Sequence, residues 1–384
     1  MTPSHPVAIR RLAYIDWMRG LACVLMIQAH CYDSWLSSEA RKSGFYRWSQ
    51  EVSTLAAPIF LFLCGVSFAL VTERMSQENK PRSQIFKTAI FRGMEILGFG
   101  FLLRIQEFVL GYPKSPWTNL LRVDVLNVLG VSIILMALFW RTATTFAVHE
   151  SSMTWRRWMI AFSLAISAIV ALATPPLWTT YRLRFLPWML ESYINGVHIY
   201  DAPSPWLFSI FPWTGFAFVG LAFGLFLFTD FAQRQESSAL AAVATIGAVA
   251  CAMSLWWDSS RVRMYAVYDY WHSSPNFFLM RCGILLILAF AVFAWCRWGW
   301  ATKGFSPFIQ FGKTSLLVYW AHIEFVYGRF SILPKERSSI ALSTLGMVVI
   351  FAAMLGISIW RTRSHSRAAA RLKTATTQSL GEAM

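Results

Sequence analysis

The chain has 384 residues, of which 56% are hydrophobic and 14% are charged, and its formal net charge is +15. Its apolar residues come in blocks of about twenty, the length that an α-helix needs to cross the hydrocarbon core of a bilayer. This pattern excludes a soluble globular protein and predicts an integral membrane protein. The basic residues are scattered between the apolar blocks and form no recognition motif, which argues against a nucleic-acid partner. Membrane lipids are their expected partners.

The predicted fold is all-α, a bundle of about ten or eleven membrane-spanning helices. The predicted spans are 17–36, 54–73, 86–104, 122–141, 157–174, 207–229, 239–257, 276–297, 308–330 and 338–360. If the N-terminus is cytoplasmic, the basic residues collect in the inner segments, and an even number of spans places the C-terminus on the same side. We therefore expect a cytoplasmic segment (1–16), a single transmembrane domain (17–360) and a basic, disordered cytoplasmic tail (361–384).

The first predicted span carries its ionisable residues on one face. On a helix that advances about 100° per residue, Asp16, Arg19, His30 and Asp33 fall within an arc of about 100°. Ionisable side chains are costly in lipid, so this face is expected to point into the bundle or a water-filled cavity. Histidine exchanges a proton near neutral pH, and His30 lies about 20 Å from Asp16 toward the outer surface. Asp33 is expected to orient the His30 ring or to support its charged form.

The Asp16–Arg19 pair and His30 each allow two interpretations. Asp16 and Arg19 are three residues apart and can form an ion pair at the cytoplasmic end. That pair either marks the point where the helix leaves the membrane or helps to hold an acyl donor. His30 is either a proton-transfer group or an interior histidine whose hydrogen bonds are simply satisfied.

Three later spans also carry polar side chains. Arg104 ends the third span and Glu107 follows it at helical spacing, and Arg122, Asp124 and Asn127 begin the fourth. The ninth carries His322, Glu324 and Tyr327 near its outer end. The predicted topology puts seven ionisable groups in the outer half of the bilayer, which predicts a shared cavity. They are His30, Asp33, Arg104, Glu107, Asp124, His322 and Glu324. For each residue alone, an interhelical hydrogen bond or a snorkelling side chain is the alternative.

The two longest segments between predicted spans, 37–53 and 175–206, both fall on the predicted outer side of the membrane. The second contains Trp178, Trp188, Tyr193, His198 and Trp206. Aromatic rings beside polar groups suit a sugar ligand, and they are equally typical of the aromatic belt at a membrane surface. The six cysteines include no C-x-x-C pair, and all six fall in predicted spans. We therefore expect no metal site, no disulfide framework and no bound cofactor.

Five blocks of the sequence resemble those of a known family, in the same order. They are YIDWMRGLACVLMIQAH (14–30), APIFLFLCGVSFAL (57–70), LLRVDVLNVLGVS (120–132), FPWTGFAFVG (211–220) and FGKTSLLVYWAHIEFVYG (311–328). They are similar to blocks of the bacterial membrane proteins related to the heparan-alpha-glucosaminide N-acetyltransferase catalytic domain. The resemblance covers nearly the whole chain.

The resemblance implies a polytopic acyltransferase of the bacterial inner membrane. Such an enzyme moves an acyl group, expected to be acetyl, from a cytoplasmic acyl-CoA co-substrate to an amino sugar or glycan at the other side of the membrane. The matching positions are Asp16, Arg19, Gly20 and His30, then Pro58 and Gly65, Asp124 and Gly130, Pro212, Trp213 and Gly215, and finally His322. One departure limits the transfer of function. The eukaryotic lysosomal enzyme has Asn where this chain has His30, and its functional histidine lies in an outer loop, whereas residues 37–53 contain no histidine.

The predicted site follows from these observations together. The candidate catalytic residues are His30, Asp33, Asp124, His322 and Glu324, with His30 as general base or acyl carrier. The candidate acyl-CoA-binding residues are Asp16, Arg19, Arg104 and Asn127. The alternatives are a proton-coupled transporter and an O-acyltransferase of the acyltransferase-3 or glucan succinyltransferase type. The oligomeric state stays open, with a homodimer as one option.

Overall fold

The computed structural model describes residues 12–113, 115–146, 152–195, 208–260 and 262–381. Within these ranges the regular structure is helical, and the strand-like pairing is an isolated bridge between Leu36 and Ser338. The predicted all-α fold is confirmed. The chain divides into two compact units, each described by itself. The central unit comprises Ala57–Ala294, and the terminal unit comprises Ala13–Ala56 together with the chain from Trp295 onward.

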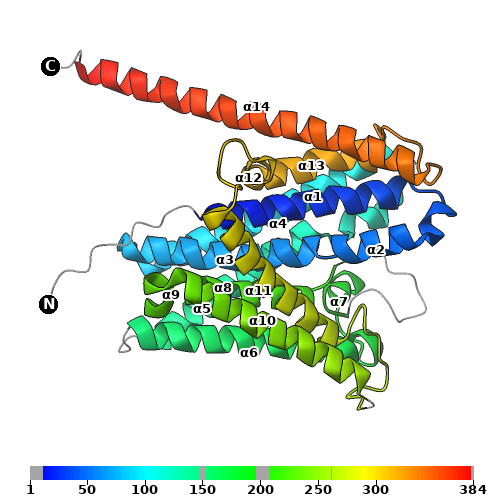
Figure 1. Ribbon diagram of the computed structural model, residues 1–384, viewed down its shortest axis with the longest axis horizontal. Helices are drawn as coiled ribbons and strands as arrows, with labels where there is room; N and C mark the ends of the chain where they lie inside the picture. Colours follow the sequence, from blue (N-terminus) through cyan, green and yellow to red (C-terminus); the bar gives the residue numbers. More distant parts are fainter. Residues whose placement is uncertain (1–11, 114, 147–151, 196–207, 261, 382–384) are drawn as a thin grey trace. The chain divides into compact units, whose positions relative to one another are not determined.

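The central unit is built from ten helical segments of the described chain. These are α3 (Ala56–Gln77), α4 (Arg82–Gly111), η2 (Trp117–Leu121), α5 (Val125–Phe146), α6 (Ser152–Thr179), α7 (Trp188–Asn195), α8 (Trp213–Phe226), α9 (Asp230–Arg234), α10 (Glu236–Ser259) and α11 (Pro275–Trp298). α4 packs along α5, and α6 packs along α8 (Figure 1). Glycines bring α3 and α8 into backbone contact, because a Cβ atom at Gly65 would lie 1.9 Å from the Ala217 carbonyl oxygen and one at Gly220 would lie 1.8 Å from that of Phe62.

The terminal unit gathers helices from both ends of the chain. They are α1 (Ala13–Trp35), η1 (Ala40–Lys42), α2 (Gly44–Ser53), α12 (Pro307–Lys313), α13 (Ser315–Val326) and α14 (Ile340–Gly381). α1 packs against α12, α13 and α14 (Figure 1). At Gly20 a Cβ atom would lie 1.8 Å from the Phe308 carbonyl oxygen, and at Gly312 one would lie 1.9 Å from that of Asp16. The glycine of the Arg19-Gly20 pair therefore permits the close approach of α1 and α12.

Helices lie at all of the predicted span positions, but only some have the length and composition of a spanning helix. In the described residues six segments do: Gly44–Gln77, Trp117–Phe146, Met153–Thr179, Glu236–Ser259, Pro275–Trp298 and Ile340–Ser364. The protein is therefore an integral membrane protein. The count of ten spans and the sidedness of the termini stay predictions.

Two boundaries differ from the sequence prediction. The predicted continuous span 308–330 consists of two helices, α12 and α13, because the backbone at Thr314 (φ −129°, ψ 25°) leaves the helical conformation. Helix α14 continues to Gly381, so part of the segment 361–384, for which we predicted disorder, is helical. Its alanines and arginines have high helix propensity.

Candidate functional site

Two histidines from distant parts of the sequence meet in the terminal unit. Nδ1 of His30, on α1, lies 2.8 Å from Nε2 of His322, on α13, and Nδ1 of His322 lies 2.8 Å from the Val318 carbonyl oxygen. His322 is fully buried, whereas His30 is partly exposed. Both histidines were predicted as site residues, and the structure brings them into direct contact.

This chain of hydrogen bonds fixes the neutral tautomers of both rings. A carbonyl oxygen only accepts hydrogen bonds, so Nδ1 of His322 donates to Val318. Nε2 of a neutral His322 then carries a lone pair and accepts from His30 Nδ1–H. The remaining lone pair of His30 is therefore on Nε2, which is its basic nitrogen. A proton taken up there produces an imidazolium whose Nδ1–H still donates to His322.

Asp33 acts on this pair through a tyrosine. The Tyr327 hydroxyl donates to Asp33 Oδ2 at 2.7 Å, and the Tyr327 ring stands edge-on to the His30 ring, with centroids 5.3 Å apart. The predicted role of Asp33, to orient the His30 ring or to support its charged form, stays a prediction; the contact seen between them passes through Tyr327. Arg41 donates to the Asp33 backbone carbonyl rather than to its carboxylate.

Glu324 is buried close to the C-terminal end of α13. A Cβ atom at Gly328 would lie 2.2 Å from Glu324 Oε2, so the carboxylate occupies the space left by this glycine. Glu324 and His322 share the last turns of α13. The predicted catalytic role of Glu324 stays a prediction.

Asp16 and Arg19 lie near the opposite end of α1. Arg19 Nη1 donates to Asp16 Oδ1 at 3.2 Å, as the spacing predicts. The side chain of Asp16 is 7% exposed and that of Arg19 is 24% exposed, so Arg19 is the more accessible member of the pair. Arg19 and His30 are separated by about 16 Å of helix.

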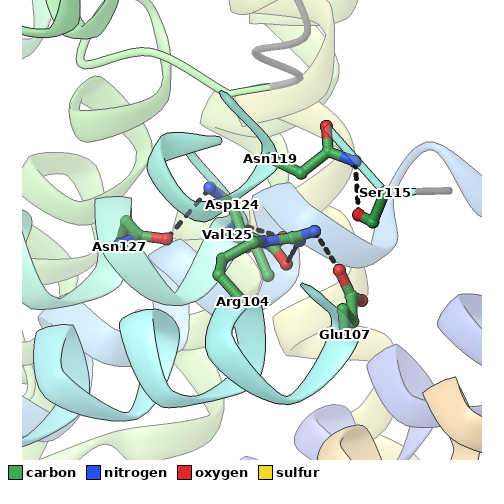
Figure 2. Close-up of polar contacts among 7 residues, drawn as sticks. All are labelled: Arg104, Glu107, Ser115, Asn119, Asp124, Val125 and Asn127. Atoms are coloured by element: carbon green, nitrogen blue, oxygen red, sulfur yellow. Dashed lines mark hydrogen bonds and ion pairs between the residues drawn. The ribbon is translucent and has the colours of Figure 1, made fainter. Parts of the chain in front are cut away.

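The central unit holds a second cluster, centred on Arg104 of α4 (Figure 2). Arg104 is buried and donates to Glu107, one turn later, and to Asp124, at the start of α5. Figure 2 shows the guanidinium between the two carboxylates. Two nearby anions compensate its charge, and the ion pair with Asp124 joins α4 to the start of α5. Removal of one partner would leave a buried charge without compensation, which is costly.

Asp124 also forms the N-terminal cap of α5. Its Oδ1 accepts from the Val125 N–H at 2.6 Å, and its own N–H donates to Asn127 Oδ1 at 3.0 Å. The side chain thus satisfies a free N–H group of the first turn. Asn127 is fully buried. On α7, burial raises the pKa of Tyr193, and a hydrogen bond with Asn127 lowers it in part.

The predicted site residues therefore form separate groups. His30, Asp33, His322 and Glu324 belong to the terminal unit, as do Asp16 and Arg19. Arg104, Asp124 and Asn127 belong to the central unit. The shared cavity stays a prediction. Tyr327 was not among the predicted site residues. The sequence could have indicated Tyr327 through its position five residues after His322, which places the two residues near the same end of one helix.

The aromatic outer segment is described up to Asn195. Arg182 forms an ion pair with Glu191, and the Asn195 amide donates to the carbonyl oxygens of Leu177 and Tyr181. Trp188 stands edge-on to Trp117, with centroids 6.2 Å apart. His198 and Trp206 lie outside the described residues.

Two family models match the chain, and each covers one of the two histidines. The family model described as heparan-alpha-glucosaminide N-acetyltransferase, catalytic, matches residues 11–256, more than half of the chain and the part that contains His30. The chain belongs to this family. A second model, described as OpgC protein, matches residues 157–366, which contain His322. No curated protein matches the chain. Membership places the protein among the membrane acyltransferases, as the sequence blocks predicted.

Proposed function

We propose that the protein transfers an acyl group, acetyl in the first instance, from acyl-CoA to an amino sugar or glycan, with His30 as the general base. The observation that carries the proposal is the hydrogen-bond chain Val318–His322–His30, which puts the basic lone pair of His30 on Nε2. General bases act best when the ring is held in one tautomer and orientation. A histidine with only a packing role does not need a second histidine to fix its tautomer.

The chemistry requires one proton transfer in each direction. The acceptor amine attacks the thioester carbonyl and gives its proton to His30 Nε2 as the new C–N bond forms. His322 accepts from Nδ1–H of the imidazolium and so favours the charged form. When the C–S bond breaks, the proton passes to the departing sulfur and leaves CoA as the free thiol. The products are an amide and CoA, and His30 returns to its neutral state.

The two ends of α1 suit the two ends of an acyl-CoA. The Arg19 side chain is partly exposed, and arginine forks match phosphate oxygens. The extended pantetheine arm of CoA separates its phosphates from the thioester. We therefore propose that Arg19, held by Asp16, binds the phosphates at the cytoplasmic side, and that the thioester lies beside His30 toward the outer side. The membrane proposed is the bacterial inner membrane.

The acceptor group is a separate question, which the second family match raises. Residues 157–366 match the OpgC model, which favours the O-acyl alternative in which the acceptor is a glycan hydroxyl. A hydroxyl is the weaker nucleophile and depends more on removal of its proton, so His30 serves either acceptor. An assay should therefore contain both acceptor types.

The test is acyl transfer by the purified protein in detergent. Radiolabelled acetyl-CoA is incubated with glucosamine, with a soluble glucan, or with neither, and labelled product is counted. We expect His30→Ala to lower turnover by about 10²-fold or more, the usual contribution of a general base. The matched control is His272→Ala, since His272 is exposed and pairs with Asp269 in the central unit. Undiminished transfer by His30→Ala would remove the base assignment.

The same assay separates the two chemical routes. Without acceptor, an acyl carrier retains radiolabel on the wild-type protein and loses it in His30→Ala. A general base leaves no label on the protein. CoA-independent solute uptake into liposomes, with no acyl transfer, would favour the transporter over the enzyme.

A further inference from the structure

One positive charge within a spanning helix has no role in the proposed reaction. Arg281 lies on α11, about 9 Å along the axis from its first residue, Pro275. α11 is among the most apolar of the candidate spans, with a mean hydropathy of 2.5. A charge at this position needs an anion or water close by, because lipid does not solvate it.

The Arg281 side chain points back toward the start of α11. Its guanidinium carbon lies 3.9 Å from the centre of the Phe277 ring, one turn earlier. Side chains on a helix lean toward its N-terminus, so the charged group approaches the level of the helix start. Phe277 in turn contacts Tyr270 and Trp271, and these three rings lie within 5.2 to 5.3 Å of one another. Tyrosine and tryptophan typically lie at the level of the lipid headgroups.

Three other arginines of the central unit have a carboxylate partner within the chain. Arg104 contacts Glu107 and Asp124, Arg156 contacts Glu73, and Arg182 contacts Glu191. Arg281 differs. Among the described residues its guanidinium contacts the Phe277 ring and no carboxylate is found beside it. Its Nε is buried without an acceptor in the same part of the chain, as are those of Arg104 and Arg156. The nearest acidic side chain along the chain, Asp269, is engaged by His272.

We propose that Arg281 binds the phosphate group of an anionic ligand, with the rings of Tyr270, Trp271 and Phe277 lining the site. An arginine fork donates two hydrogen bonds to phosphate oxygens. Stacking on Phe277 holds the fork in a fixed direction. The phosphate belongs either to a membrane lipid or to a soluble phosphate ester. Both present the same group to the guanidinium.

The experiment measures lipid binding by the full-length protein. Delipidated protein in detergent is titrated with phosphatidylglycerol, and bound lipid is counted by native mass spectrometry. We expect Arg281→Gln to weaken the tightest lipid-binding step by about tenfold, the value of a lost charged hydrogen bond. A second titration contains millimolar inorganic phosphate. Displacement of the lipid by phosphate identifies a soluble phosphate as a competent ligand, and no displacement identifies the lipid as the source.

Arg263→Gln is the matched control. Arg263 is also a cation over an aromatic ring, 4.1 Å from the centre of Tyr268, but its guanidinium donates to the Asp258 and Ser260 carbonyl oxygens. It should bind lipid like the wild type. Equal affinity of Arg281→Gln and the wild type would overturn the proposal, as would equal weakening by both substitutions. Arg281→Lys keeps the charge without the fork and should weaken binding severalfold. If Arg281→Gln fails to fold, wild-type affinity in Arg281→Lys overturns the proposal.

Discussion

His322 has no exposed surface, and both of its ring nitrogens lie within hydrogen-bond distance of a group in the same unit. In the proposed mechanism it is therefore a positioning residue, which acts on the reaction through His30. The sequence identified both histidines as candidates because each interrupts an apolar helix. It did not indicate that they touch. Periodicity gives the face of a helix that carries a residue, whereas the identity of the facing helix depends on packing between segments 292 residues apart.

This role predicts a graded effect of substitutions at His322. Phenylalanine fills the buried space but offers no acceptor to His30 Nδ1, so we expect the turnover number to fall by about tenfold or more. The KM for acyl-CoA should change little, because His30, which His322 contacts, is separated from Arg19 by about 16 Å of α1. Glutamine keeps an acceptor oxygen and should restore part of the rate. Steady-state kinetics in detergent measure both constants. Loss of acyl-CoA affinity in His322→Phe, with turnover unchanged, would contradict the positioning role.

At the scale of elements, the start of α5 combines two interactions in one side chain. Asp124 caps the helix and binds Arg104 of α4. The aspartate was selected from the sequence as catalytic because it recurs in a family block and lies at the edge of a span. The cap could have been inferred from the D-x-x-N spacing of Asp124 and Asn127. The ion pair with Arg104 could not, since it depends on how α4 lies against α5.

We expect Asp124 to contribute mainly to stability. Asp124→Ala removes the cap, worth about 0.5–2 kcal/mol, and takes one carboxylate from the buried Arg104. It should lower the melting temperature more than Asp124→Asn, which keeps an acceptor oxygen for the Val125 N–H. Thermal unfolding in detergent, followed by acyl transfer of the surviving protein, checks this. If Asp124→Asn is as stable as the wild type yet inactive, the residue is catalytic and not only structural.

The positions of the helices were predictable, because about twenty apolar residues in a row have few other structures available in a membrane protein. The break between α12 and α13 was not. Gly312, Lys313 and Thr314 sit inside an apolar block whose average hides them. Gly312, in the last turn of α12, packs against the backbone of Asp16 on α1, and the helix is interrupted two residues later. A hydropathy average contains no information on such contacts.

At the scale of the whole molecule, the number of helices that cross the membrane determines on which side each loop lies. Between Ser76, at the end of α3, and Val262, just after α10, the chain forms the longer helices α4, α5, α6, α8 and α10. If all five cross, the two residues lie on opposite sides. α8 is the shortest of the five helices. Its 14 residues extend about 21 Å, which is less than the roughly 30 Å of the hydrocarbon core. α4 is long enough but carries several charges.

Cysteine labelling decides the parity of these crossings. Ser76 and Val262 are both exposed, and each is replaced by cysteine in a variant whose six natural cysteines have been removed. By the positive-inside rule, Val262→Cys should react with a membrane-impermeant maleimide in intact cells, and Ser76→Cys only after permeabilisation. Labelling of both from the same side would mean that an even number of these helices cross. α8 would then be the first helix to be reassigned as one that does not cross the membrane. Labelling of Ser76→Cys alone would keep the parity but invert the topology, and it would move His30 to the opposite side of the membrane.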